Sequence, residues 1–284
     1  MQKMIAVGDE FYWSQPVLAE QLRELGLQPG DSVMVHVSLR AAGPCLNGAD
    51  DLIDALLQCT GEKGTLLCYV SWLENYEDCT GNDGCVPAAL KPLIMPFDVR
   101  TSRANPDHGV FAECFRTRLG ALRSANPGAS VAAIGAKAAC FTENHPLCYG
   151  YGEDSPFARL AAENGKVLMP GAPADTMSLL HHAESIAPLR NKRIRRRELP
   201  FLRADGSTEW VMSEEFDTVD PVCDCFPEGY FAQIVADFCL QNNNVRQGNV
   251  GSAATLLVSA REILDFAVNW MTAYQNRAGN RCGG

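Results

Sequence analysis

Long hydrophobic runs are missing from this chain of 284 residues. A membrane-spanning helix needs about 18 or more consecutive apolar residues, whereas the longest apolar stretches, such as 131–134 and 255–258, have only the length of a strand. Residues 1–10 carry one lysine and then become acidic, so they do not predict a secretion signal. We therefore expect a soluble, cytoplasmic protein with no membrane partner.

An excess of positive charge is also missing. The chain has 24 Lys and Arg against 34 Asp and Glu, which gives a net charge of −10. Nucleic acids and anionic membrane surfaces attract basic proteins, so we expect neither as the main partner. The same negative charge permits a cationic partner.

The cysteine spacing that marks metal sites and disulfide frameworks is absent, although the chain has 12 Cys. No two cysteines form a C-x-x-C pair, and the closest are Cys223 and Cys225. Zinc ribbons and small secreted disulfide domains depend on regular short spacings. We therefore predict reduced thiols and no metal site.

The common phosphate-binding and nucleophile loops are absent too. The sequence contains neither G-x-x-x-x-G-K-[ST] nor G-x-G-x-x-G, and it has no G-x-S-x-G nucleophile elbow. Residues 40–45 come near the cofactor loop of the common N-acetyltransferase superfamily, but Cys45 stands where that loop has Gly or Ala. We interpret this likeness as chance.

Helix and strand patterns alternate along the chain, which predicts an α/β fold. No linker rich in Pro, Gly or Ser divides it, so we expect one domain over 1–274, followed by a flexible tail over 275–284. The predicted strands of a mixed sheet are 31–38, 65–71, 130–134, 166–170, 194–199 and 210–212. The predicted helices are 16–26, 50–59, 110–116, 155–164, 175–186, 230–240 and 259–274.

Two adjacent histidines, His181 and His182, follow a predicted strand and a Gly/Pro turn. Ligands of α/β proteins collect at the carboxyl ends of strands. Neighbouring residues of a helix point about 100° apart, so only one histidine can face such a site and the pair cannot share a metal ion. Glu184 lies on the face of His181, and a histidine with a carboxylate partner is a ready general base. A purely structural bond to a carboxylate explains His181 equally well.

Acidic residues are concentrated in 204–245, which has nine Asp and Glu and no Lys or Arg. Such a block repels itself unless it is solvated or faces an outside cation. It is therefore either an acidic surface or a cleft for a polyamine-like substrate. Its densest part contains Glu214, Glu215 and Asp217.

The irregular segment 72–108 is rich in Gly and Pro, and loops of that length in a compact domain are usually functional. Its first residues combine Trp72 and Tyr76 with Glu74. Aromatic rings cover sugar faces and attract cations, and carboxylates bind ammonium groups. We expect the loop to bind a sugar or an amine, unless it is an exposed acidic loop with incidental aromatics.

Basic residues are concentrated in 190–197, where six of eight residues are Lys or Arg. This segment could hold the phosphates of an anionic cofactor. We favour a strand with a solvated basic edge, which also discourages aggregation.

A set of motifs, each weak alone, occurs in order over most of the chain. Together they resemble the aminoglycoside 3-N-acetyltransferases, the antibiotic N-acetyltransferase family. The motifs are 35–39 with Gly43, 109–116, 123–127, 130–135, His145, 155–156, 175–184 and 214–217.

The resemblance implies a single α/β/α domain around a mixed sheet, distinct from the common acetyltransferase fold. It also implies acetyl transfer from acetyl-CoA to the 3-amino group of a 2-deoxystreptamine aminoglycoside, which confers antibiotic resistance. Such a substrate is a cationic sugar, which suits acidic and aromatic residues.

Residue roles follow from the resemblance and the patterns together. His181 is the expected general base, and Glu215 is preferred over Glu184 as its orienting partner. Thr176 or Ser178 is expected to donate to the thioester oxyanion. The residues expected to bind the cofactor are Val37, Ser38, Leu39, Ser124, Thr176 and Ser178. The residues expected to bind the substrate are Trp72, Glu74, Tyr76, Glu214 and Asp217.

Three alternatives stay open at this point. The reaction could pass through an acyl-enzyme formed on one of the cysteines. The protein could bind polyamines or aminoglycosides without catalysis, or it could acylate an amine that is not an antibiotic.

Overall fold

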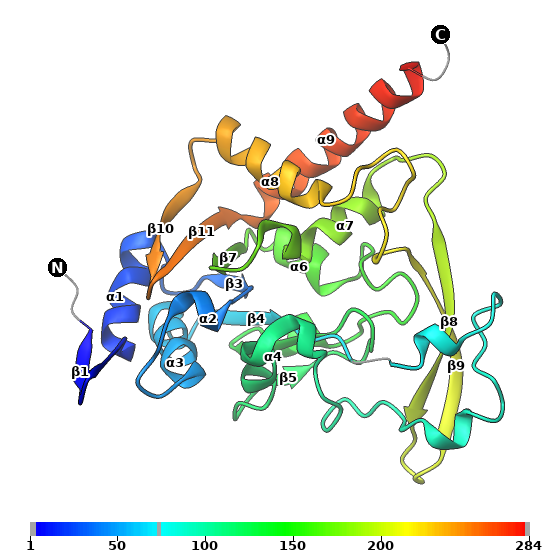
Figure 1. The fold of residues 1–284 in the computed structure, drawn as a ribbon, viewed down its shortest axis with the longest axis horizontal. Coiled ribbons are helices and arrows are strands. Elements are labelled where there is room, and N and C mark those ends of the chain that lie inside the picture. The colour runs from blue at the N-terminus through cyan, green and yellow to red at the C-terminus, as the bar shows by residue number, and fades with distance from the viewer. Residues whose placement is uncertain (1–3, 73–74, 282–284) are drawn as a thin grey trace.

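The computed structural model describes residues 4–72 and 75–281. Its centre is a seven-stranded sheet with the strand order β10-β11-β7-β3-β4-β6-β5 (Figure 1). The strands are β3 (Ser32–Val35), β4 (Thr65–Tyr69), β5 (Leu122–Arg123), β6 (Val131–Gly135), β7 (Lys166–Pro170), β10 (Arg246–Val250) and β11 (Ala253–Ser259).

The sheet is mixed. β3 runs parallel to both β4 and β7, and the remaining neighbours pair antiparallel. The three parallel strands therefore direct their carboxyl ends to the same edge of the sheet. Segments that follow them in sequence meet there, which is where α/β sheets place ligands.

Side chains of the central strands alternate between two cores. On β3, Val33 and Val35 belong to one buried cluster, whereas Met34 belongs to the other. On β7, Leu168 shares the core of Val33, and Val167 lies in the core of Met34. A strand that is apolar on both faces must be covered on both sides, which explains the two helical layers.

The helices form one layer on each face of the sheet (Figure 1). The layers follow from the two clusters, because the buried residues of each helix belong to only one of them. One face carries α1 (Gln15–Leu25), α3 (Ala49–Thr60) and α4 (Gly109–Arg116). The other carries α5 (Ala138–Thr142), α6 (Pro156–Ala162), α7 (Leu179–Ile186), α8 (Tyr230–Gln241) and α9 (Ala260–Arg281). The expected α/β/α architecture is confirmed.

One part of the predicted sheet is wrong. β8 (Ile194–Leu202) and β9 (Thr208–Phe216) pair with each other in a separate two-stranded sheet and do not join the central one. The hairpin lies at one end of the molecule (Figure 1). Its rungs place Arg196 opposite Glu214, and strands that carry such charges could not be buried between two helical layers.

The long segment after β4 follows this hairpin. It contains three short 3-10 turns, η1 (Glu77–Cys79), η2 (Lys91–Leu93) and η3 (Pro106–His108), with irregular chain between them. Backbone bonds join Phe97 to Pro200 and Glu198 to Gly84. The predicted irregular loop is therefore confirmed, and its place is against β8.

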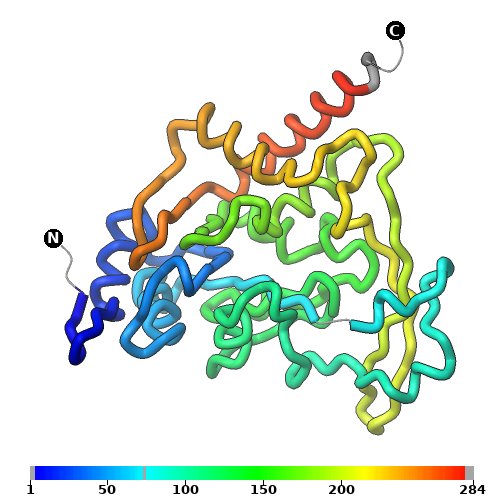
Figure 2. The backbone as a smooth tube through the Cα atoms, viewed as in Figure 1, coloured from blue at the N-terminus to red at the C-terminus, as the bar shows by residue number. Residues whose placement is uncertain are grey.

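Three strands of the central sheet, β5, β10 and β11, were not predicted from the sequence. The other unpredicted elements are small. They include the hairpin of β1 (Ile5–Val7) and β2 (Glu10–Tyr12), and the short α2 (Leu39–Ala42). α9 continues to Arg281, beyond the predicted helix end at residue 274, and it projects from the body of the molecule (Figure 2). Gln, Arg and Ala in this stretch are good helix formers. In the described ranges, no helix has the length and apolar character of a membrane span.

Candidate active site

A cavity of about 500 Å³ lies at the strand edge and is here called the strand-end cavity. Segments following β3 and β7 line it, together with the end of β4 and the start of α4. These lining residues are Val35, His36, Val37, Ser38, Cys68, Tyr69, Asp107, His108, Gly109, Phe111, Ala172, Pro173, Asp175, Thr176, Ser178 and His181.

Gly171 allows the two strand-end loops to approach closely. Its backbone has φ +67°, and a Cβ placed there would lie 2.4 Å from the Cβ of Ala41. Gly171 also forms a β-bridge with Val37, and the N–H of Ser38 donates to the carbonyl of Pro170 at 3.0 Å. A side chain at position 171 would separate the loops that line the cavity.

A smaller cavity of about 200 Å³ adjoins the strand-end cavity and is here called the acidic cavity. His181 and Asp175 line both cavities. His181 therefore stands between a space lined by loops after the strands and a space lined by carboxylates. The other residues that line the acidic cavity are Glu184, Thr218, Val219, Asp220, Pro221, Glu228, Gly229, Tyr230 and Phe231.

The imidazole of His181 is fixed by a carboxylate and two rings. Its Nδ1 lies 2.6 Å from Oε2 of Glu184. The rings of Tyr151 and Phe231 pack against it, with centroid distances of 5.0 and 4.9 Å. Among the described residues, no side chain or backbone group bonds its Nε2. That nitrogen is left to meet a substrate.

The preference for Glu215 as the partner of His181 is wrong. Glu184 is only 2 % exposed, and its second oxygen, Oε1, accepts a hydrogen bond from Tyr230. The carboxylate of Glu215 instead accepts backbone N–H groups of Phe216, Gly150 and Tyr151. Burial raises the pKa of Glu215, which these bonds and His181 oppose. Glu215 thus holds the loop that places Tyr151 against His181.

The neighbouring His182 has a different role, as the helix angle predicted. It is buried, and its Nδ1 lies 2.7 Å from the carbonyl oxygen of Tyr151. Burial lowers the pKa of His182, so a neutral ring supports the same loop. Of these two neighbouring histidines, His181 lines the cavities and His182 does not.

Four of the six expected cofactor residues line the strand-end cavity, namely Val37, Ser38, Thr176 and Ser178. Leu39 follows Ser38 as the first residue of α2 and packs against the core of α1 and α3.

The expectation for Ser124 is wrong. Ser124 is 0 % exposed. Its hydroxyl accepts the N–H of Val131 at 3.0 Å and lies 2.8 Å from Nδ1 of His145. These bonds give Ser124 a structural role inside the molecule, with no access to a ligand.

Two histidines in the strand-end cavity were not among the sequence candidates. His108 lies with Nε2 2.5 Å from the hydroxyl of Ser71. His36 is 9 % exposed, and its buried Nε2 has no hydrogen-bond partner among the described residues. Burial is the main cause that lowers the pKa of each to about 4. Both rings are neutral at pH 7, and only the position of His36 directly after a buried strand could have drawn attention to it.

Among the described lining residues of the strand-end cavity, Cys68 is the only cysteine. Burial raises the pKa of its thiol to about 12. A thiol with such a pKa is protonated at neutral pH and is a poor nucleophile.

The expected substrate residues that the structure describes lie on or beside the β8–β9 hairpin. Trp72 packs against Tyr76 and Phe97, and Tyr76 packs against Trp210. Glu74 lies outside the described residues. None of the described candidates (Trp72, Tyr76, Glu214 and Asp217) lines either of the two cavities.

The acidic block and the basic run of the sequence neutralise each other. Arg196 lies 2.6 Å from Glu214, which also accepts a hydrogen bond from Tyr149. Arg193 and Arg195 lie within 4 Å of the carboxylate of Asp217. Most of these charges are therefore satisfied within the protein and do not call for an outside cation.

Three carboxylates of the acidic cavity differ in this respect. Asp175, Asp220 and Glu228 line it, and no ion pair within residues 4–72 and 75–281 involves any of them. Unpaired acids around one cavity create a negative potential that attracts cations. The acidic cavity, and not the hairpin, has the charge that a cationic ligand needs.

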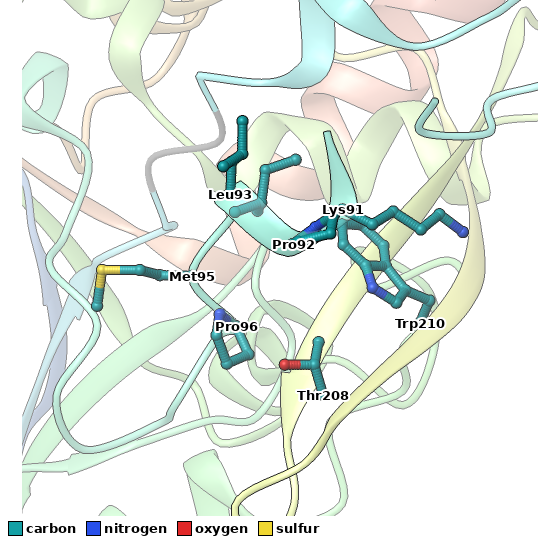
Figure 3. A pocket seen from close by; sticks show the side chains of 8 residues that line it. Lys91, Pro92, Leu93, Met95, Pro96, Thr208 and Trp210 are labelled. Atoms are coloured by element: carbon teal, nitrogen blue, oxygen red, sulfur yellow. The ribbon is translucent and has the colours of Figure 1, made fainter. Parts of the chain in front are cut away.

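A further cavity, of about 480 Å³, lies between residues 91–96 and β9 (Figure 3). Its single charged lining residue in the described chain is Lys91, which pairs with Glu198 at 2.8 Å and lies over the ring of Trp210. It offers neither an imidazole nor a carboxylate for proton transfer.

An α/β/α fold with two adjoining cavities and a carboxylate-bound imidazole between them defines the class of this protein as an α/β/α enzyme. The chain belongs to the antibiotic N-acetyltransferase family, described as aminoglycoside 3-N-acetyltransferase, whose family model matches residues 34–272. The family expected from the sequence motifs is confirmed.

Individual relatives agree with this membership. Aminoglycoside N(3)-acetyltransferase III of Pseudomonas aeruginosa is 41% identical over 258 residues, which is 89% of this chain and 92% of the relative. The solved structure of AAC-IIIb in a binary complex with CoASH has a TM-score of 0.90 and 47% identity, over 92% of this chain and 97% of that one. AAC-VIa bound to sisomicin has a TM-score of 0.87 and 38% identity, over 92% and 98% of the two chains.

Proposed function

We propose that this protein transfers the acetyl group of acetyl-CoA to the 3-amino group of 2-deoxystreptamine aminoglycosides and so confers resistance to them. The observation that carries the proposal is the position of His181, which lines both the strand-end cavity and the acidic cavity. Relatives that cover nearly the whole chain include one solved with CoASH and one solved with sisomicin. Acetyl-CoA is the cosubstrate.

Charge and position assign one substrate to each cavity. An aminoglycoside carries several ammonium groups, which suit the unpaired carboxylates of Asp175, Asp220 and Glu228. Acetyl-CoA extends through the strand-end cavity past Val37 and Ser38. The amine and the thioester then meet beside His181.

Nε2 of His181 acts as the general base. An ammonium group has no lone pair, so it must lose a proton before it can attack the thioester. That first proton goes to solvent, and Nε2 takes a second proton from the amine as its nitrogen bonds to the carbonyl carbon. Collapse of the tetrahedral intermediate breaks the C–S bond, and the imidazolium returns the proton to the departing thiolate. Glu184, hydrogen-bonded to Nδ1, fixes the tautomer and stabilises the imidazolium.

Ser178 is the better donor for the oxyanion of the intermediate. The hydroxyl of Thr176 already donates to the carbonyl of Pro173 at 2.7 Å. Ser178 lines the same cavity, and no group in the described chain bonds its hydroxyl. A hydroxyl that is free before the substrate arrives can be directed at the developing charge.

Direct transfer is favoured over an acyl-enzyme. An acyl-enzyme needs a thiolate near the thioester, and the cysteine in that cavity, Cys68, has a pKa of about 12 because of burial. His181 has no cysteine among its hydrogen-bond or ring partners in the described chain. Direct transfer in a ternary complex needs only the groups that line the two cavities.

The test is a CoA-release assay with a thiol reagent. Protein and acetyl-CoA are mixed with gentamicin, with kanamycin, and with an analogue whose 3-amino group is blocked. We expect free CoA with the first two and none with the blocked analogue. Binding of the drug without CoA release would identify a binding protein instead. Release with other amines but not with these drugs would identify an acyltransferase of a different substrate.

A further inference from the structure

The carboxylate of Glu184 has two partners. Its Oε2 lies 2.6 Å from Nδ1 of His181, and its Oε1 accepts a hydrogen bond from the hydroxyl of Tyr230. Both Glu184 and Tyr230 are buried, at 2 and 5 % exposure. A buried carboxylate is stable as an anion only when donors satisfy its oxygens, and here each oxygen has one.

Packing fixes the ring of Tyr230 independently of its hydroxyl. The ring stacks on Phe226 with centroids 4.7 Å apart and an interplanar angle of 10°. It contacts Phe231 edge-on at 4.9 Å, and Phe231 in turn packs against His181 at 4.9 Å. The hydroxyl is therefore held toward Glu184 by α8 and the preceding loop, whereas Glu184 and His181 both belong to α7.

The hydroxyl of Tyr230 is a permanent donor. Burial, followed by the negative charge of Glu184, raises the pKa of Tyr230 above its usual range. The hydroxyl of Tyr230 therefore keeps its proton and continues to donate a hydrogen bond to the carboxylate of Glu184.

We propose that Tyr230 is a positioning residue for the transfer reaction, which sets the orientation and the proton affinity of His181 through Glu184. This inference rests on the proposed function for its role in catalysis. The hydroxyl withdraws charge from the carboxylate, so it weakens the stabilisation that Glu184 gives to the protonated ring. It also prevents Glu184 from rotating away from Nδ1.

Other charged and titratable groups surround the pair and stay unchanged when Tyr230 is altered. On the acidic side they are Asp175, Glu215, Asp220 and Glu228. Three more lie in loops: Lys192 before β8, Cys223 before α8, and Tyr151 before α6. In the strand-end cavity they are His36, Asp107 and His108.

The test measures the pH profile of kcat/KM for Tyr230→Phe. Loss of the donor leaves more charge on Glu184 and stabilises the imidazolium, so the base is neutral only at higher pH. We expect the acidic limb of the profile to move up by about half to one pH unit. We expect kcat on the plateau to fall, with KM for acetyl-CoA unchanged.

The matched control is Tyr12→Phe, which removes another Tyr–Glu hydrogen bond, the one to Glu10 on β2. It should leave the profile unchanged. A second comparison adds Tyr230→Phe to Glu184→Gln. Since the amide has no charge to modulate, the double variant should show the same acidic limb as Glu184→Gln alone.

Two further measurements keep the inference open to refutation. If Tyr230→Phe does not fold, 3-fluorotyrosine at position 230 keeps the ring and donates more strongly, so the acidic limb of the kcat/KM profile should move to lower pH.

An NMR titration of the His181 ring without substrate should shift in the same directions. This titration tests Tyr230 even if no aminoglycoside is acetylated, a result that would refute the proposed function separately. The inference would be overturned if folded Tyr230→Phe showed no shift in either the acidic limb or the His181 titration. It would also be overturned if Tyr230→Phe shifted the limb equally in the Glu184→Gln background.

Discussion

Nδ1 of His181 lies 2.6 Å from Oε2 of Glu184, three residues further along α7. This spacing puts both side chains on one helical face, so the base and its partner are positioned by a single element. The two cavities that His181 lines determine which ligands can reach Nε2.

Replacing His181 with Ala should lower kcat by about 10²–10⁴, the usual contribution of a general base. The protein should stay folded, although its melting temperature should fall, because the buried carboxylate of Glu184 loses the donor to its Oε2. Steady-state kinetics and a thermal melt measure the two effects. The comparison variant His182→Gln should lose stability but keep most of its kcat, because His182 is buried against the carbonyl of Tyr151 and lines neither cavity. Near-normal turnover of His181→Ala would contradict the assignment.

Glu184 and Glu215 can be separated by paired Gln variants. Glu184→Gln should lower kcat by about tenfold to a hundredfold, because the imidazolium loses the carboxylate that stabilises it. Glu215→Gln should act mainly on stability, since its carboxylate holds backbone N–H groups at Gly150, Tyr151 and Phe216. Kinetics and urea unfolding of both variants decide the matter. A larger loss of kcat in Glu215→Gln than in Glu184→Gln would restore the preference drawn from the sequence.

Local patterns predicted much of this fold and the centre of its site. Strand and helix periodicity located most of the helices and four strands of the central sheet, β3, β4, β6 and β7, because a buried strand or an amphipathic helix shows its period in a short window. It missed β5, β10 and β11. His181 was found in the same way, from a strand, a turn and a helical spacing. These signals do not depend on distant residues.

Long-range pairing explains what the sequence did not predict. The acidic block containing Glu214 and Asp217 looked available to a cationic ligand, but Arg196 and Arg193 neutralise it across the β8–β9 hairpin. Composition shows charges and not their partners. Ser124 illustrates the same limit, because a motif serine is equally visible whether it faces a cavity or the interior.

The carboxylates of the acidic cavity should determine aminoglycoside affinity. Asp220→Asn removes one unpaired charge of the cavity, and we expect KM for the aminoglycoside to rise about fivefold, an effect of order 1 kcal/mol. Glu214→Gln provides the comparison. Its charge is already paired with Arg196 outside the cavity, so KM should change less than twofold. Initial rates at two salt concentrations measure this, and a larger increase for Glu214→Gln would return substrate binding to the hairpin.

Cys68 should be dispensable for chemistry. Its thiol, with a pKa of about 12 because of burial, cannot supply a thiolate at neutral pH. We expect Cys68→Ala to retain kcat within a few fold, and wild-type protein mixed with radiolabelled acetyl-CoA to carry no acetyl group after denaturation. A stable acetylated protein that disappears in Cys68→Ala would establish the acyl-enzyme route.

The buried histidine His145 should make stability depend on pH. Its Nε2 lies 2.7 Å from the carbonyl of Gly150, and its Nδ1 lies 2.8 Å from the hydroxyl of Ser124. Burial, opposed by the bond to Gly150, lowers the pKa of His145 from the usual 6.5 to about 4. Between these values the unfolded chain binds a proton that the folded chain does not. The stabilising contribution is therefore fully present above pH 6.5 and is lost as the pH falls toward 4.

This loss can be measured against a variant that does not titrate. His145→Gln keeps a donor and an acceptor, and the bonds to Gly150 and Ser124 can re-form. Between pH 7.5 and pH 5, we expect the free energy of unfolding to fall by about 2 kcal/mol more in the wild type than in the variant. His36 and His108 continue to titrate in both proteins and cancel in the comparison. Urea unfolding at the two pH values supplies the numbers. Parallel losses in the two proteins would show that His145 takes up its proton equally in the folded and unfolded chains.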